Sequence, residues 1–338
     1  MLKKSFFSIL LIISLLASLL FLSSCSSGEP RFMRLDGFIG GTQGLSVKVL
    51  EGAPPNVIMD MGITPFSFIV ALENVGEAPV GLGTNNPFVM VRLAGIMPNN
   101  FGLTPEESAK TLDAKLEPAK MNFDGTILPG EISYVSFDNL VYKPDVFDTL
   151  ALTIRAEACY DYESYASAKF CMKKDVLESW EDASICMLRG YRPLGTSSAP
   201  IQVTSVREAP LNNSAIQLNI GIEHLGRGVF FSKSQPKDLL SACDFSELNP
   251  DIYKLEVFVE PIEKGAYEVS CARLDDRIPG GGAHGVVRMF QGAPITVSCF
   301  LSRTQPLNVR IYEDMLSIRL SYRYAEFLEV PILIQGHP

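Results

Sequence analysis

The chain has 338 residues, of which 29 are Lys or Arg and 38 are Asp or Glu, giving a formal net charge of -9. An acidic chain is a poor ligand for nucleic acid, because phosphate binding requires a basic face. The composition therefore argues against a nucleic-acid partner, and the length allows two domains of ordinary size.

The segment from Met1 to Ser24 has the pattern of an export signal. Lys3–Lys4 precede an uncharged run from Ser5 to Leu22, the order of a charged n-region and an apolar h-region. Ser23–Ser24 then stand directly before Cys25, which resembles a lipobox. The resemblance implies cleavage before Cys25 and a diacylglycerol on its thiol, so the membrane becomes a partner. An ordinary signal peptide or an uncleaved anchor are the alternatives. All three place the mature chain outside the cytoplasm, membrane-anchored in the first case, in the periplasm or at the cell surface.

The domain prediction follows from this start. Residues 1–24 are the signal peptide, and residues 25–42 are the lipidated cysteine with a tether. Residues 43–199 and 200–338 are two β-sandwich domains with a boundary near Ser197–Pro200. Strands dominate because apolar residues alternate with polar ones over long runs. The runs are Phe66 to Leu72, Leu150 to Ile154 and Leu316 to Tyr324.

Short helices are predicted between the strands. Thr104-Pro105-Glu106-Glu107 forms a capping-box pattern, which predicts a helix from Thr104 to about Leu116. A second helix is expected over Val176 to Met187 and a third from near Pro236. The predicted fold class is all-β with short helical insertions.

The two halves have matching strings in the same order, which indicates a duplication. Phe66 to Leu72 followed by Glu73-Asn74-Val75-Gly76 matches Ile216 to Ile222 followed by Glu223-His224-Leu225-Gly226. Val135-Ser136 matches Val297-Ser298. Leu152-Thr153-Ile154-Arg155 with Tyr160 matches Leu316-Ser317-Ile318-Arg319 with Tyr324. We therefore expect two copies of one sandwich.

The string from Phe66 to Val80 resembles the second strand and turn of adhesion-related immunoglobulin-like domains of prokaryotic surface lipoproteins. The Asn74-Val75-Gly76 turn carries part of the resemblance, and the second half departs from it with His224 in place of the Asn. The resemblance covers only this short string and its counterpart in the second half. It implies two tandem immunoglobulin-like β-sandwich domains in an extracellular setting, and it transfers no site residues.

Six cysteines are left once Cys25 is assigned to the lipid, and six thiols outside the cytoplasm suggest three disulfides. Sequence alone allows fifteen connectivities. We favour Cys271 with Cys299, because both lie in Val-Ser-Cys strings of neighbouring strands, and Cys171 with Cys186, which bracket a short segment. Cys159 and Cys243 then pair by elimination. No Cys-x-x-Cys or clustered Cys/His spacing predicts a metal site.

Three tyrosines, Tyr160, Tyr162 and Tyr165, are the candidate recognition residues, because exposed tyrosines commonly contact proteins and sugars. They surround an expected hairpin turn, although alternation places Tyr160 and Tyr162 on one face, where core packing explains them equally well. A protein or a glycan is the corresponding partner.

No catalytic residues and no cofactor are predicted. Residues 280–285 satisfy G-x-G-x-x-G but precede a strand-like run, which favours a hairpin loop over a nucleotide site. His224, His284 and His337 are isolated in sequence, and the carboxylates Asp275–Asp276 or Asp161 with Glu163 form no distinctive pair.

The sequence therefore predicts a non-enzymatic, surface-anchored binding or structural module of the cell envelope. One alternative is a self-assembling, pilus-like appendage subunit in which Phe38 to Leu50 completes a neighbour's sheet. The lipobox, tether and two sandwiches look like anchored pilus subunits in architecture. A second alternative is a secreted hydrolase on a β-sandwich, which requires a deep cleft with converging carboxylates or histidines.

Overall fold

The computed structural model describes residues 37–233, 239–245 and 249–337, all within a single unit of the chain. The signal peptide, Cys25 and most of the tether lie outside the described residues, as does the start of the helix expected near Pro236. The described chain is nearly all β. Its helical elements are three 3-10 turns, namely η1 (Pro98–Phe101), η2 (Glu106–Ser108) and η3 (Phe290–Gly292). None of the helices in this part of the chain is long and apolar enough to span a bilayer.

The helices predicted over residues 104–116 and 176–187 are corrected by the structure. The capping box exists: Thr104 N donates to Glu107 Oε2 (2.8 Å), and Glu107 N donates to Thr104 Oγ1 (3.2 Å). It caps only η2, because the next residues, including buried Ala109, form a strand. Residues 176–187 form turns and one bridge between Asp182 and Cys186. A capping motif fixes where a helical turn begins but not how far it continues.

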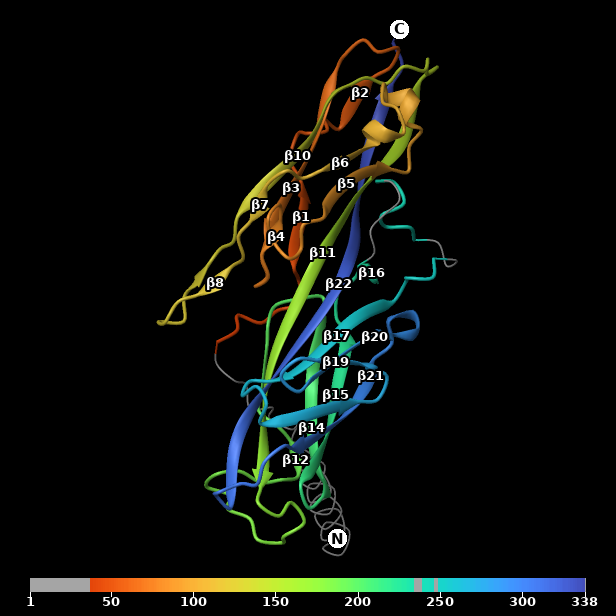
Figure 1. The fold of residues 1–338 in the computed structure, drawn as a ribbon. Coiled ribbons are helices and arrows are strands. Elements are labelled where there is room, and N and C mark those ends of the chain that lie inside the picture. Colours follow the sequence, from red (N-terminus) through yellow and green to blue (C-terminus); the bar gives the residue numbers. More distant parts are fainter. Residues whose placement is uncertain (1–36, 234–238, 246–248, 338) are drawn as a thin grey trace, which may run out of the picture. The chain divides into compact units, whose positions relative to one another are not determined.

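Two long strands run through the described unit (Figure 1). β11 (Thr149–Lys173) and β22 (Ile311–Gln335) have 25 residues each and pair antiparallel, from Thr149 opposite Gln335 to Lys173 opposite Ile311. One comes from each half of the sequence. The two halves are therefore joined by a shared ribbon and do not form separate units.

The first sandwich is built around the beginning of β11 and the end of β22. One layer has the order β1-β3-β10, and the other contains β6, β5, β11, β22 and β2, the last pairing parallel to β22. The bounds of its strands are β1 Leu45–Val49, β2 Val57–Met59, β3 Phe66–Asn74, β5 Val89–Ala94, β6 Ala109–Thr111 and β10 Ile132–Leu140. Two ribbons of very short strands lie beside it: β4 (Val80–Gly81) with β7 (Lys115–Leu116), and β8 (Lys120–Met121) with β9 (Ile127–Leu128).

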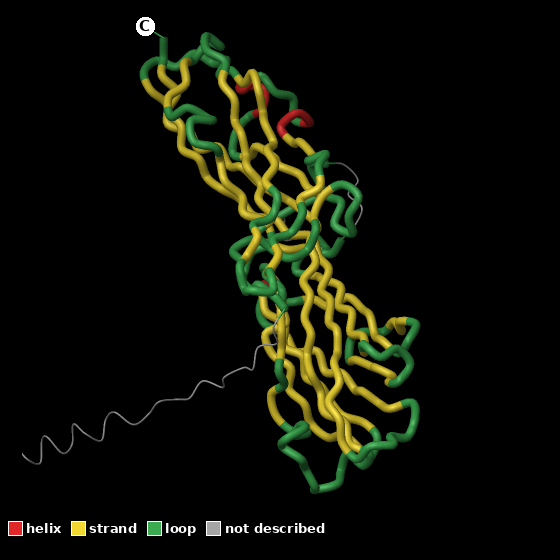
Figure 2. The backbone as a smooth tube through the Cα atoms, turned by 90° about the vertical axis from the view of Figure 1, so that its left-hand side faces the viewer, coloured by secondary structure: helices red, strands yellow, loops and turns green. Residues whose placement is uncertain are grey.

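The second sandwich is built around the end of β11 and the beginning of β22. One layer has the order β12-β14-β15-β21-β18, and the other contains β13, β11, β22, β17, β20 and β19. Its strands are β12 Gly190–Tyr191, β13 Leu194–Thr196, β14 Ile201–Asn212, β15 Ala215–His224, β17 Lys254–Pro261, β18 Tyr267–Cys271, β19 Asp276–Ile278, β20 Gly282–Arg288 and β21 Ile295–Arg303. β16 (Val229–Phe231) pairs with β22 near its middle. In Figure 2 the yellow strands continue from one sandwich into the other.

The alternation predicted from the sequence gives the core. On β3, Phe66, Phe68, Val70 and Leu72 are buried, whereas the apolar and polar residues between them are only half-buried. β15 repeats the pattern with Ile216, Leu218, Ile220 and Ile222. These side chains join one continuous apolar cluster with residues of β11 and β22. The inner faces of the sheets in both sandwiches therefore pack on the shared ribbon, as sheet-on-sheet packing requires.

The duplication is also present in the hydrogen bonds at the centre of the ribbon. Leu45 N donates to Tyr160 Oη and Ile201 N to Tyr322 Oη, both at 3.4 Å. Ala78 N donates to Tyr162 Oη (3.4 Å) and Gly228 N to Tyr324 Oη (2.7 Å). Tyr160 thus corresponds to Tyr322, and Tyr162 corresponds to Tyr324, with the same offset in sequence for both pairs.

The sequence match of Tyr160 with Tyr324 is therefore shifted by two positions. Tyr324 is instead the register partner of Tyr160 across the ribbon. The centre of the duplication lies between Asp161 and Arg323, which are register partners and have a sequence separation of 162, the same offset as the tyrosine pairs. An approximate two-fold axis at this pair relates the two sandwiches. Each sandwich contains one half of β11, from the first half of the sequence, and one half of β22, from the second half.

Candidate binding site

The structure contains three disulfides, Cys159–Cys243, Cys171–Cys186 and Cys271–Cys299, which are the pairs favoured from the sequence. Cys271 and Cys299 are direct register partners on β18 and β21. Cys159 on β11 fixes the loop around Cys243. Disulfides of this number indicate an oxidising compartment.

The structure does not present the tyrosines for recognition. Tyr160 and Tyr162 are buried (1% and 0% exposed), and their rings pack edge to face with centroids 6.0 Å apart. Tyr165 is half-buried, and its hydroxyl donates to Glu163 Oε2 (2.7 Å). The expected hairpin turn is absent because residues 160–165 lie in the middle of β11. Core packing, the second interpretation of the alternation, accounts for Tyr160 and Tyr162.

Two of the carboxylates considered for hydrolysis, Asp161 and Glu163, are held in ion pairs. Asp161 Oδ1 accepts from Arg323 Nε (2.9 Å), and both side chains are almost fully buried. Glu163 pairs with Arg319 (2.8 Å) and lies 3.9 Å from Lys233 Nζ. Buried pairs with satisfied hydrogen bonds fix geometry and leave no free base for catalysis.

The histidines lie in separate places. His224 Nε2 lies 3.3 Å from Tyr324 Oη, and burial lowers the pKa of this imidazole. His284 stacks on Phe258 with centroids 4.1 Å apart, on the second strand of the hairpin whose turn contains Gly280 and Gly281. Within the described ranges, no three His, Cys, Asp or Glu side chains are grouped to hold a metal ion.

One side of the second sandwich is closed by a short crossing segment. Its β12 end pairs with β14, and Arg192 N donates to Val206 O (2.8 Å). Its β13 end pairs antiparallel with β11, Leu194 lying opposite Ala168 and Thr196 opposite Ala166. We call residues 190–197 the closing segment. It covers the outer edges of both layers at this side and buries Leu194.

Among the described residues, the first sandwich has no such cover at the corresponding place. β1 is the edge strand of its sheet, and β22 has strand partners on its outer edge between Leu316 and Ala325 and again from Leu333. We call the stretch of β22 from Glu326 to Val330 the open edge. Adding the offset of 162 to the β11 positions covered by β13 gives positions 328–330, so the open edge is the counterpart of the covered edge.

The backbone of the open edge has groups directed away from β11. Outward bonds on β22 are made by odd-numbered residues: Leu333 N donates to Asn56 O (2.9 Å), and Met315 O accepts from Ile262 N (3.2 Å). Phe327 and Glu329 have the same parity. Among the described residues, no backbone group pairs with their outward N–H and C=O. Pro331 follows, which has no N–H, a common residue at strand edges.

A cavity of about 490 Å³ lies behind the open edge, between the beginning of β1 and β22. It is lined by Thr42–Val47, Tyr160, Pro200, Leu225–Gly228, Tyr324 and Glu326–Leu328. Glu326, Leu328 and Val330 are half-buried, whereas Ile332 and Ile334 further along the same face are buried. The inner face of β22 is therefore only partly covered next to the open edge.

Glu326 is the carboxylate that lines this cavity. The Tyr160 hydroxyl donates to its Oε1 at 3.4 Å, and burial raises the pKa of the Glu326 carboxyl to about 7. No described Lys or Arg forms an ion pair with Glu326. The cavity thus has a carboxylate that a cationic group would stabilise in its charged form.

The chain stretch that corresponds to β13 takes another path. Thr196 stands five positions before β14, and the same spacing before β1 gives residues 38–40 as the counterpart of β13. Ile39 N donates to Glu77 Oε1 (2.9 Å), and Gly41 O accepts from Gln202 Nε2. Ser198 Oγ donates to Gln43 O (2.8 Å). These contacts hold residues 39–43 beside the start of β14, and the open edge is left uncovered by this stretch.

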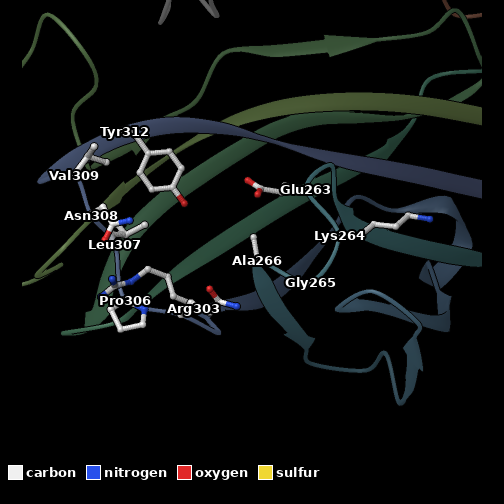
Figure 3. A pocket seen from close by; sticks show the side chains of 11 residues that line it. Glu263, Lys264, Gly265, Ala266, Arg303, Pro306, Leu307, Asn308, Val309 and Tyr312 are labelled. Atoms are coloured by element: carbon white, nitrogen blue, oxygen red, sulfur yellow. The ribbon is translucent and has the colours of Figure 1, made fainter.

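A second hollow, of about 540 Å³, lies at the turn after β17 and the loop before β22 (Figure 3). Figure 3 shows Tyr312 and Glu263 on opposite walls with Leu307 and Arg303 nearby. Burial raises the pKa of Tyr312 to about 12, with Asp314 and Glu263 adding to the effect. Arg303 is engaged, because its Nη2 donates to Lys174 O (2.8 Å). This hollow lies outside the pair of related edges on β11 and β22, so it is the weaker candidate.

Comparison with protein-family models gave no match, and comparison with curated proteins gave no significant match. The site is therefore defined by geometry alone. Sequence reasoning missed both Glu326 and the open edge. The one signal in the sequence was the glycine-rich stretch 37–44, which stands where the second half has the closing segment.

Proposed function

We propose that the protein is a non-catalytic, exported binding module of the cell envelope, anchored through a lipid on Cys25, that binds its partner at the open edge of the first sandwich. The observation that carries the proposal is the difference between the two related edges. The edge on β11 is covered by β13, whereas no residue in the described part of the chain pairs with the outward backbone groups of the edge on β22, which lies beside a cavity. Three disulfides and the lipobox pattern support the setting.

We also propose that each sandwich is a form of the immunoglobulin-like plan in which the last long strand is shared with the other copy. The alternation and turn at Phe66 to Val80, together with the two facing sheets, support this classification. The pilus-like alternative is less favoured in its original form. Phe38 to Leu50 supplies β1, which pairs with β3 of its own chain from Leu45 opposite Asn74 to Val49 opposite Val70.

Site-specific photo-crosslinking in the native membrane tests the binding function. A photoreactive residue is placed at Phe327, on the open edge, and in a matched variant at Leu333, which is similarly exposed on the same strand but lies beside β2. Adducts heavier than the chain at 327 and not at 333 are expected. Equal labelling at both positions, or none at 327, contradicts the proposal.

Intact mass of the membrane-extracted protein, with and without reduction, tests the anchor. The proposal requires loss of residues 1–24, a mass increase from a lipid on Cys25 and three reducible bonds. An unlipidated chain would remove the anchor from the proposal and leave the binding edge to be tested separately.

A further inference from the structure

The covered edge on β11 is a template for what fits the open edge on β22. Because β13 lies antiparallel to β11 with Leu194 opposite Ala168, the two-fold relation places a corresponding apolar side chain opposite Val330. The same relation places the counterpart of Thr196 opposite Leu328 and the counterpart of Ser198 opposite Glu326. These three positions share one face of the strand, since side chains alternate with a period of two.

The space behind the open edge has a carboxylate, Glu326, where its counterpart has a hydroxyl, and Arg227 also lines it. In the second sandwich the position corresponding to Glu326 is Ser164, which is buried, as is Ser198. In the first sandwich the carboxylate of Glu326 faces the cavity, and Glu329 lies on the other face of the open edge. A chain of net charge -9 adds to this preference for a cation.

We propose that an extended, cationic peptide segment of another polypeptide adds antiparallel to β22 along the open edge, with an apolar side chain beside Val330 and a Lys or Arg side chain beside Glu326. This rests on the proposed function and names its ligand class. The backbone groups of Phe327 and Glu329 supply the pairing, as in other cases of strand addition, and the cavity supplies specificity. A second copy of this chain is a poorer occupant, because its own open edge carries the same two carboxylates.

The probe is a synthetic peptide that copies the closing segment. It has the sequence of residues 192–198, Arg-Pro-Leu-Gly-Thr-Ser-Ser, with Ser198→Lys, and both ends are blocked. Binding to the mature chain is measured at pH 8 by calorimetry up to about 1 mM peptide. Peptides carrying Ser198→Glu or Leu194→Asp are controls, and each is expected to bind at least tenfold more weakly.

Three protein variants separate the contribution of the backbone hydrogen bonds from that of the Glu326 charge. Glu329→Pro removes an outward N–H without touching the ladder to β11, and should weaken the lysine peptide at least tenfold, whereas Glu329→Ala should stay within about threefold. Glu326→Gln should weaken the lysine peptide about tenfold and the unmodified Ser198 peptide less than twofold. Circular dichroism of each variant checks folding.

The proposal is overturned if the lysine peptide does not bind, or if it binds equally well to Glu329→Pro. It is also overturned if sedimentation shows that the chain dimerises through the same edge, with Glu329→Pro abolishing the dimer, because a second copy would then be the occupant. Adducts at Phe327 in the membrane together with failure of the peptide would leave the binding function intact and remove only this ligand class.

Discussion

The two sandwiches are related by an approximate two-fold axis, and one difference between them lies at the edges beside the shared ribbon. In the second, residues 190–197 cross from β14 to β11 and cover both edges. In the first, the corresponding residues 38–40 lie beside Ser198 and Glu77, and the edge of β22 stays open. Since a sheet edge with free backbone groups is a template for another strand, proteins usually cover or blunt it. An edge covered in one copy and open in the other points to a binding role for the open one.

The disulfides on the shared ribbon should differ in how much they contribute to the free energy of unfolding. Replacing Cys159 and Cys243 by Ala should cost about 4.5 kcal/mol in the chain-entropy model, because the sequence separation of this pair is 84, against about 3 kcal/mol for Cys171 and Cys186, whose separation is 15. Denaturant unfolding of the two double variants measures the difference. A larger loss for the Cys171/Cys186 variant would contradict the chain-entropy estimate for the two disulfides.

The central ion pair should affect both sandwiches together. Asp161→Ala leaves Arg323 buried without its carboxylate, and we expect a loss of about 3–5 kcal/mol in one cooperative transition. The control Asp113→Ala removes an exposed carboxylate and should change stability by less than about 0.5 kcal/mol. Two separate unfolding transitions in the Asp161→Ala variant would show that the sandwiches are independent.

The Glu326 carboxyl, which lies beside the open edge, should make the free energy of unfolding depend on pH. The pKa of its carboxyl is about 7 in the folded chain against an ordinary value of 4.5, so the folded state holds the proton more tightly. The resulting stabilisation is full below about pH 4.5 and is lost as pH rises to about 7. The difference of about 2.5 pH units corresponds to at most about 3 kcal/mol. The Glu326→Gln variant should lack this pH dependence. Parallel pH profiles of unfolding free energy for the variant and the unsubstituted chain would contradict the prediction.

The smallest expected stability losses come from substitutions in the closing segment and in its counterpart, residues 38–40. Leu194→Ala empties a buried position and should cost about 2–3 kcal/mol. Phe38→Ala, at the corresponding place before β1, should cost less than about 1 kcal/mol because Phe38 is only half-buried. Thermal or denaturant unfolding of both variants gives the comparison. Equal losses would mean that residues 38–40 already close the first sandwich.

Local patterns in the sequence were sufficient for the longer alternating strands, but not for short strands such as β6 and β7 or for the pairing of strands. The alternation at Phe66 to Leu72 and at Ile216 to Ile222 predicts the buried faces, because a period of two is fixed within each strand. It does not show that Leu150 to Ile154 and the three tyrosines belong to one continuous strand, β11. Register across the ribbon joins residues that are far apart in the chain, such as Tyr160 and Tyr324, and a single sequence does not contain that information.

The site was harder to predict than the fold. Glu326 lies in an ordinary alternating run of the sequence. It matters because, among the described residues, no strand covers the edge of β22 beside it, and a local sequence pattern does not contain that information. The tyrosines attracted attention as exposed aromatics, although their hydroxyls are used to bind the backbone of β1 and of the turn after β3.

The most direct test of the difference between the two sandwiches is amide hydrogen exchange of the dilute, unliganded protein, resolved by residue. Phe327 and Glu329 on the open edge should exchange quickly, whereas Tyr165 and Lys169 should be protected, because their amides donate to Ser197 Oγ and Pro193 O. Fast exchange at the first pair alone is the predicted result. Equal protection of all four amides would show that the open edge is covered and would contradict the account.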